Sequence, residues 1–139
     1  MGRILAIDYG RKRVGLAVTD PLQIIANALK TVETKEIWNF LEDYLKKEEV
    51  ECIVIGYPRQ LNNQVSDSVR YINPFLGRLR KLYPNIDIKQ VDERFTSKIA
   101  HQTMRDAGLK KKARQNKALV DTISATIILQ SYLEQRLNY

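Results

Sequence analysis

The sequence contains 139 residues, of which 44% are hydrophobic and 28% charged, as is ordinary for a globular protein. We expect residues 1–139 to form one domain with a sizeable core. The net charge of +7 favours a polyanionic partner, nucleic acid before membrane, because no basic amphipathic helix with a large aromatic face is evident. There is no signal-peptide core and no apolar segment of about 18 residues, so we expect a cytoplasmic protein.

Cysteine and histidine are too few to build a zinc site. Cys52 is the only cysteine and lies in the apolar run of residues 52–55, where a thiol usually acts as a small buried hydrophobe. His101 is the only histidine. Zinc sites built on thiolate or histidine are therefore excluded, and any metal must be held by oxygen.

The first strands follow from residues 4–18, where two apolar runs are joined by a basic turn and the first run ends in one carboxylate, Asp8. An apolar run of about four to eight residues bounded by turn signals predicts a strand buried on both faces. Residues 14–18 complete a hairpin, and residues 24–32 continue the sheet less cleanly. We therefore expect three consecutive antiparallel strands.

After these strands the apolar residues recur at helical spacing. The expected helices are one from Thr34, one between Val65 and Leu82, one from Thr96 or Ser97 to Gly108, and one from about Lys117 to Arg136. Pro74 lies inside the second of them and should kink or break it.

Two further strands separate these helices. Residues 52–55 are apolar throughout and are followed by Gly56-Tyr57-Pro58, which predicts a strand in the sheet interior. Residues 86–91 largely alternate, as an edge strand does. Both strands enter through helical crossovers and should run parallel to the first. The predicted fold is α/β, with a five-stranded mixed sheet in the order 3-2-1-4-5 and helices on both faces.

Three acidic residues occupy positions where apolar structure ends or is interrupted. Asp8 follows the first strand, Glu93 follows the fifth, and Asp121 shares a helical stripe with Ala125 and Ile128. Two of them have a simpler interpretation. Asp8 could merely start a turn, and Asp121 could interact with the helix dipole, an effect of about 0.3–1 kcal/mol.

If the three carboxylates converge, they need a compensating cation. Magnesium prefers oxygen ligands, and two such ions about 4 Å apart would activate a water and stabilise the leaving oxygen of a phosphodiester. Basic residues near the three acids would bind the flanking phosphates, and we expect residues 110–117 to be mobile without ligand. The candidate nucleic-acid-binding residues are Arg11, Lys12, Arg13, Arg94, Lys110, Lys111, Lys112, Arg114 and Lys117. By contrast, we interpret Arg78, Arg80 and Lys81 as ordinary solvated charge.

The same residues carry a family resemblance. The chain resembles the YqgF (RuvX) family in Ile7-Asp8-Tyr9-Gly10, in Gly56-x-Pro58, in Asp92-Glu93-Arg94-Phe95-Thr96-Ser97, and in Asp121 followed by Ala125, Ile128, Leu129 and Tyr132. The resemblance spans nearly the whole chain in the correct order. It implies an RNase H-like fold, with Asp8, Glu93 and Asp121 as catalytic residues that bind Mg²⁺ or Mn²⁺. It also implies a nuclease that acts in 5′-end processing of pre-16S rRNA.

Other functions stay open. The family also includes Holliday-junction-resolvase-like proteins, which would act on branched DNA. A ribosome-assembly factor would keep the fold and basic surface without hydrolysis. In each case we expect a monomer or homodimer. An ATPase of the actin and sugar-kinase type would need a second copy of the first hairpin, and the chain has none. Two features depart from the expected site: residues 60–64 lack the glycine usual in the family, and Glu93 must reach across the fourth strand to join Asp8.

Overall fold

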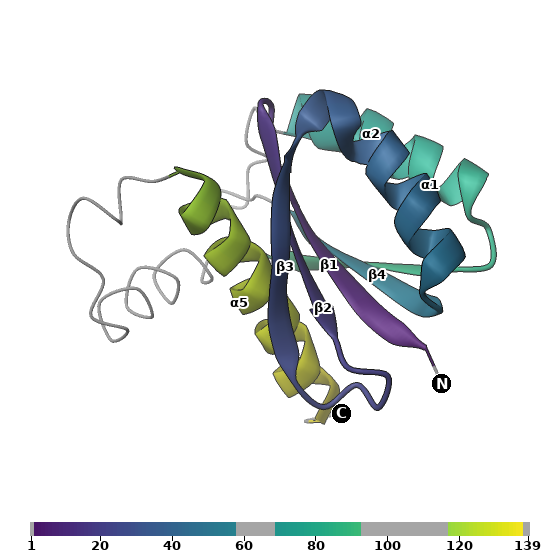
Figure 1. Cartoon of the computed structure of the whole chain (residues 1–139), viewed down its shortest axis with the longest axis vertical. Helices are drawn as coiled ribbons and strands as arrows, with labels where there is room; N and C mark the ends of the chain where they lie inside the picture. Colours follow the sequence, from purple (N-terminus) through teal and green to yellow (C-terminus); the bar gives the residue numbers. More distant parts are fainter. Residues whose placement is uncertain (1, 58–68, 93–116, 138–139) are drawn as a thin grey trace.

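A five-stranded mixed sheet in the order β3-β2-β1-β4-β5 forms the centre of the protein (Figure 1). The computed structural model describes residues 2–57, 69–92 and 117–137, and in the last segment it describes the side chains of residues 122–136. β1 pairs in parallel with β4, and β4 with β5, whereas β2 is antiparallel to β1 and β3. The predicted strand order and directions are confirmed. The strands are β1 (Arg3–Tyr9), β2 (Arg13–Thr19), β3 (Ala26–Glu33), β4 (Val50–Tyr57) and β5 (Asp87–Asp92).

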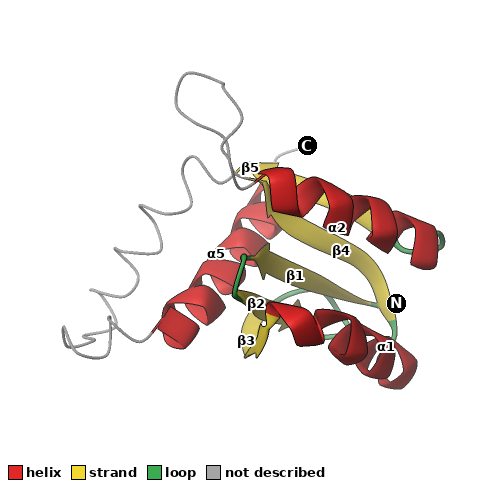
Figure 2. Ribbon diagram, turned by 90° about the horizontal axis from the view of Figure 1, so that it is seen from above, coloured by secondary structure: helices red, strands yellow, loops and turns green. Residues whose placement is uncertain are grey.

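Helices cover both faces of this sheet, as predicted. The short 3₁₀ helix η1 (Thr34–Glu36) leads into α1 (Ile37–Lys47), which shares one face with α2 (Val69–Leu82), while α5 (Lys117–Leu137) covers the other face (Figure 2). The predicted third helix and residues 110–116 of the basic loop lie outside the described residues. None of the helices in residues 2–57, 69–92 and 117–137 combines the length and the hydropathy that spanning a bilayer requires.

The alternation of side chains along β1 determines which layer each residue contacts. Leu5 and Ile7 pack in the cluster with α1 and α2, whereas Ile4 and Ala6 pack under α5. All four side chains are at most 1% exposed, so β1 is buried on both faces, as its apolar run predicts. The next position in the α5-facing series is Asp8, which is partly buried.

One apolar stripe of α5 packs on the sheet. Ala125, Ile128 and Leu129 are buried there, and Tyr132 is partly buried beside them, as the predicted helical stripe requires. Cys52 lies in the same cluster with 6% of its surface exposed, and burial raises the pKa of its thiol. The cysteine is therefore the small buried hydrophobe expected from the sequence.

The sequence predicts that Pro74 kinks or breaks its helix. The helix α2 continues through Pro74, so the break is wrong and the kink stays a prediction. Proline removes one backbone hydrogen bond and crowds the preceding turn. Ile72 before it and Phe75 and Leu79 after it are all buried in the same core cluster, however, while Pro74 itself is exposed. Burial of apolar side chains on both sides of the proline keeps the two halves of the helix together.

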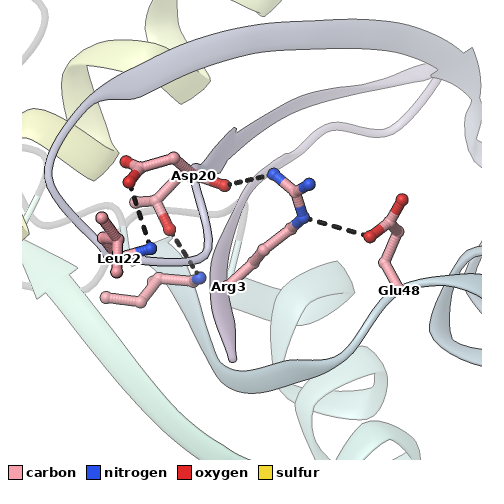
Figure 3. A network of polar contacts seen from close by, with 6 residues as sticks. Arg3, Asp20, Leu22 and Glu48 are labelled. Atoms are coloured by element: carbon pink, nitrogen blue, oxygen red, sulfur yellow. Dashed lines mark hydrogen bonds and ion pairs between the residues drawn. The ribbon is translucent and has the colours of Figure 1, made fainter. Parts of the chain in front are cut away.

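The carboxylate of Asp20 organises the turn between β2 and β3. It accepts hydrogen bonds from the backbone N–H groups of Leu22 (3.1 Å), Ile24 (2.9 Å) and Ile25 (2.8 Å), and Figure 3 shows the first of these. Because Ile24 and Ile25 donate to this carboxylate, β3 begins at Ala26 rather than at residue 24. All three apolar side chains of the turn are at least 60% exposed.

Two side chains attach this turn to the rest of the protein. Gln23 has a positive φ of 60° and points inward, where its amide donates to the Gly2 carbonyl (2.7 Å) and its side-chain oxygen accepts from Arg136 of α5 (2.6 Å). Arg3 donates to the carbonyl of Thr19 at 3.0 Å and pairs with Glu48 at 3.2 Å (Figure 3). The turn is therefore connected to both the start of β1 and the end of α5.

The hydrogen bonds to Asp20 predict a pH-dependent contribution to stability. The backbone N–H groups of Ile25 and Ile24, which donate to the carboxylate, hold the pKa of Asp20 below its usual value. A lowered folded-state pKa stabilises the protein above the unfolded pKa of about 3.9, and this contribution is lost as the pH falls through the folded pKa. Thermal unfolding of wild type and Asp20→Ala should therefore differ most near pH 6 and converge in acid. A Tm difference that does not change with pH would contradict the prediction.

Candidate active site

The carboxyl ends of β1, β4 and β5 meet at one edge of the sheet, because these strands are parallel. Asp8 lies one residue beyond the pair formed by Ile7 of β1 and Ile55 of β4. On the far side of β4, Tyr57 pairs with Asp92, the last residue of β5. Glu93 follows Asp92 in the sequence and lies outside the described residues.

A row of three paired residues crosses the sheet at the level of Asp8. Asp8 pairs with Gly15 of β2, and Gly15 pairs with Thr31 of β3. Directly paired residues project on the same face of a sheet, so Asp8 and Thr31 both belong to the face that α5 covers. The strands lie about 4.8 Å apart, which separates the two backbones by about 10 Å. Gly15 contributes no side chain between them.

The helix α5 reaches this row at its second turn. The hydroxyl oxygens of Thr31 and Thr122 are 2.5 Å apart, and the Thr122 carbonyl accepts a hydrogen bond from Thr126 at 2.9 Å. Asp121 immediately precedes Thr122 in the helix. The structure therefore brings the backbone of Asp121 to the same region of the sheet as Asp8.

The position of Asp121 in the helix weakens its simpler interpretation. Because α5 begins at Lys117, Asp121 is the fifth helical residue, and the first turn contains no acid. The field of the helix dipole falls off within that first turn. A favourable dipole interaction therefore does not account for an acid at this position.

The structure gives a partial account of the three predicted acids. Asp8 is at the predicted strand end, and Asp121 is one helical turn before buried Ala125 on the predicted stripe. In the described side chains no group of three or more histidine, cysteine or acidic residues forms a metal site. The side chains of Glu93 and Asp121 fall outside that set, so the convergence of the three carboxylates stays a prediction.

The basic turn after Asp8 is held in place by Thr34. The Thr34 N–H donates to the Lys12 carbonyl at 3.0 Å, and its hydroxyl donates to the Gly10 carbonyl at 2.7 Å. Arg11 and Lys12 are exposed, whereas Arg13 begins β2 and is partly buried. Three cations thus lie within five residues of Asp8. Of the other candidate cations, Lys117 is the first residue of α5, and Arg94, Lys110, Lys111, Lys112 and Arg114 lie outside the described residues.

Two residues of this site were not predicted from the sequence. Thr31 and Thr122 are far apart in the chain, and each is an ordinary residue for the element that contains it. Only the pairing of β3 with β2 and the packing of α5 bring them together. No local pattern in the sequence signals such a contact.

The sheet order, the helices on both faces and the acid at the end of the central strand define an RNase H-like fold. A solved structure with the same architecture is T. thermophilus RuvC in complex with Holliday junction substrate, with a TM-score of 0.61 and 14% identity. That comparison covers 99% of this chain and 97% of the RuvC chain.

The chain belongs to the RuvX family, whose model is described as a Holliday junction resolvase and matches residues 2–135. A relative from Phocaeicola vulgatus is 63% identical over 136 residues, which cover 98% of each chain. Another, from Flavobacterium johnsoniae, is 54% identical over 98% of this chain and 99% of the relative. Both relatives carry the name "Putative pre-16S rRNA nuclease".

Gly10 gives a direct test of the turn that positions Arg11. A Cβ atom at Gly10 would lie 2.5 Å from the backbone oxygen of Arg13, so Gly10→Ala must displace the turn. We expect a loss of about 1–3 kcal/mol in the free energy of unfolding, measured in urea. Gly77→Ala is the control, because no atom lies within 4 Å of its Cβ position, in the exposed part of α2. That change should stabilise the protein by about 0.5–1 kcal/mol. Equal stability of wild type and Gly10→Ala would show that the turn is not constrained in this way.

Proposed function

We propose that this chain is a metal-dependent endonuclease that hydrolyses phosphodiester bonds in structured nucleic acid. The observation that carries the proposal is the shared position of Asp8 and the second turn of α5, which contains Asp121, on one face of the sheet. The family membership and the names of the relatives support the same class of activity. We assign this activity to a single domain, residues 1–139.

The proposed substrate is the precursor of 16S rRNA, since the relatives at 54–63% identity are named for it. Within that precursor, we propose a role in 5′-end processing. The net charge of +7 suits a nucleic acid of any sequence, because phosphate contacts supply most of the affinity. With such a substrate we propose a cytoplasmic location.

The carboxylates of Asp8, Glu93 and Asp121 would hold Mg²⁺ or Mn²⁺. Their oxygens fit these ions, and the structure places one of the three carboxylates, Asp8, in a partly buried position near the end of β1. A divalent ion bound there would supply charge stabilisation and lower the pKa of a bound water. Arg11 and Lys12, exposed in the adjoining turn, would bind phosphates on either side of the cleaved bond and so orient the strand.

Branched DNA is the second candidate substrate. It is favoured by the description of the matching family model as a Holliday junction resolvase. Cleavage assays on a four-way DNA junction and on an RNA spanning the 5′ end of 16S rRNA, run at equal concentrations, distinguish the two. Metal-dependent cleavage of the junction alone would overturn the rRNA assignment. Cleavage of neither substrate would favour the assembly-factor function.

Replacing the central acid tests the mechanism. Asp8→Asn keeps the shape of the side chain but removes its charge, so cleavage should fall by at least about 1,000-fold while nucleic-acid binding stays within about 3-fold of wild type. Asp87→Asn is the matched control, because Asp87 begins β5 at the opposite end of the sheet and is exposed. Rates are measured in single turnover with Mg²⁺ and with Mn²⁺. Cleavage by Asp8→Asn at the wild-type rate would remove Asp8 from the mechanism.

Neutralising the basic segment tests its role as a phosphate-binding surface. Lys110, Lys111, Lys112 and Arg114, all outside the described residues, are replaced together by glutamine. The slope of log affinity against log salt should become shallower by about one for each phosphate that the variant no longer binds. The control replaces two exposed cations at the end of α1, Lys46 and Lys47, with glutamine. An unchanged slope in the first variant would exclude the segment as a phosphate-binding surface.

A further inference from the structure

An exposed tyrosine and an arginine lie together beside the candidate active site. Tyr71, in α2, is 42% exposed and is the one exposed aromatic side chain of the described segments. The guanidinium carbon of Arg11 lies 5.3 Å from the centre of its ring. Arg11 belongs to the turn that follows β1, three residues after Asp8. The ring and the guanidinium are thus at the same end of the sheet as the candidate acid.

A group of packed aromatic rings lies one helical turn along α2 from Tyr71. Phe75 lies one helical turn beyond Tyr71 and is buried. Its ring stacks on Tyr9 with centroids 4.3 Å apart, and Trp38 of α1 lies 5.0 Å away on a tilted plane. Tyr9 is the residue after Asp8 and packs on the face of α1 and α2. The backbone that carries Asp8 is therefore directly supported by the helix that presents Tyr71.

The described part of α2 also carries several exposed cations. Arg70 and Arg78 are exposed, and the guanidinium carbon of Arg78 lies 4.4 Å from the centre of the Trp38 ring. The described helix has four cations and no acid, whereas α1 pairs its last lysines with acids one turn earlier. The expectation that Arg78 is ordinary solvated charge is thus incomplete, because the residue covers an aromatic ring. Aromatic rings alternating with guanidinium groups are typical of surfaces that bind single-stranded nucleic acid.

We propose that Tyr71 and Arg11 bind an unpaired nucleotide next to the cleaved bond, the base stacking on the tyrosine ring and the arginine binding a phosphate. This inference rests on the proposed nuclease function and specifies its substrate further, as a nucleic acid with a single-stranded segment at the active site. Stacking needs only the π-face of a base, so the site accepts any sequence. Hydrogen bonding between Tyr57 and Asn73 at 3.1 Å connects the end of β4 to this part of α2 and helps to hold the ring in position.

Binding without catalysis gives the cleanest test. Fluorescence anisotropy in EDTA, so that no cleavage occurs, measures the affinity for 12-nucleotide oligo-dT and oligo-U, for an abasic strand of equal length and for a blunt duplex. Tyr71→Ala should bind both single strands about 10-fold more weakly than wild type does. Its affinity for the abasic strand and for the duplex should equal that of wild type. Tyr71→Phe should bind like wild type, because stacking does not use the hydroxyl. Oligo-dT and oligo-U together show whether the site distinguishes DNA from RNA.

Further variants separate the two roles within the pair. Arg11→Ala should weaken binding of the abasic strand as well and make the salt dependence shallower by about one, because it removes a phosphate-binding group. Leu82→Ala is the matched control, since Leu82 is 50% exposed at the other end of the same helix and should leave every affinity unchanged. Thermal unfolding of each variant confirms that the fold is retained.

The inference is overturned if Tyr71→Ala binds single strands as wild type does, or if it loses the same affinity for the abasic strand. Its failure is distinguishable from failure of the nuclease function. If the wild-type protein cleaves nothing but Tyr71→Ala still weakens single-strand binding, the stacking site is supported and the nuclease function is not. Cleavage that depends on Asp8 but not on Tyr71, with unchanged binding, would remove the stacking site alone.

Discussion

The burial of β1 on both faces is the constraint on which the rest of the structure depends. Its four central side chains are covered by α5 on one side and by α1 and α2 on the other. A polar side chain within that run would be removed from water, at a cost of several kcal/mol if it were charged and unpaired. The first position where the chain can carry a carboxylate is therefore the strand end, and Asp8 occupies it.

Because side chains alternate along β1, its last two residues, Asp8 and Tyr9, project on opposite faces of the sheet. Asp8 projects to the face of α5, while Tyr9 packs with Phe75 on the face of α2. The helix that carries Asp121 thus approaches from one side, and the helix that presents Tyr71 approaches from the other. The adjacent residues Asp8 and Tyr9 therefore connect the candidate catalytic face of the sheet directly to the candidate nucleotide-binding face.

Much of this architecture could be predicted because it follows from local patterns. Unbroken apolar runs identified β1 and β4 as interior strands, and alternation identified β5 as an edge strand. Helical crossovers then fixed the parallel pairs. Asp8 was recognisable as an acid that ends an apolar run, and Asp121 as an acid on an apolar stripe. Both signals come from residues close in the sequence.

Features that depend on contacts between distant segments could not be predicted in the same way. The contact between Thr31 and Thr122 depends on where α5 packs on the sheet. The approach of Arg11 to the Tyr71 ring depends on how α2 meets a turn far earlier in the chain. Helix α2 continues through Pro74 because burial of the apolar side chains on both sides of the proline outweighs its low helix propensity. The start of β3 differs from the prediction because Asp20 competes for backbone N–H groups.

The buried thiol of Cys52 makes the docking of α5 observable in solution. The cysteine lies on β4 in the cluster that α5 covers, where its side chain is buried and burial raises the pKa of its thiol. A thiol reagent can therefore modify it only when the cluster opens. Since the chain has one cysteine, the modification rate measures how often the cluster between α5 and the sheet opens.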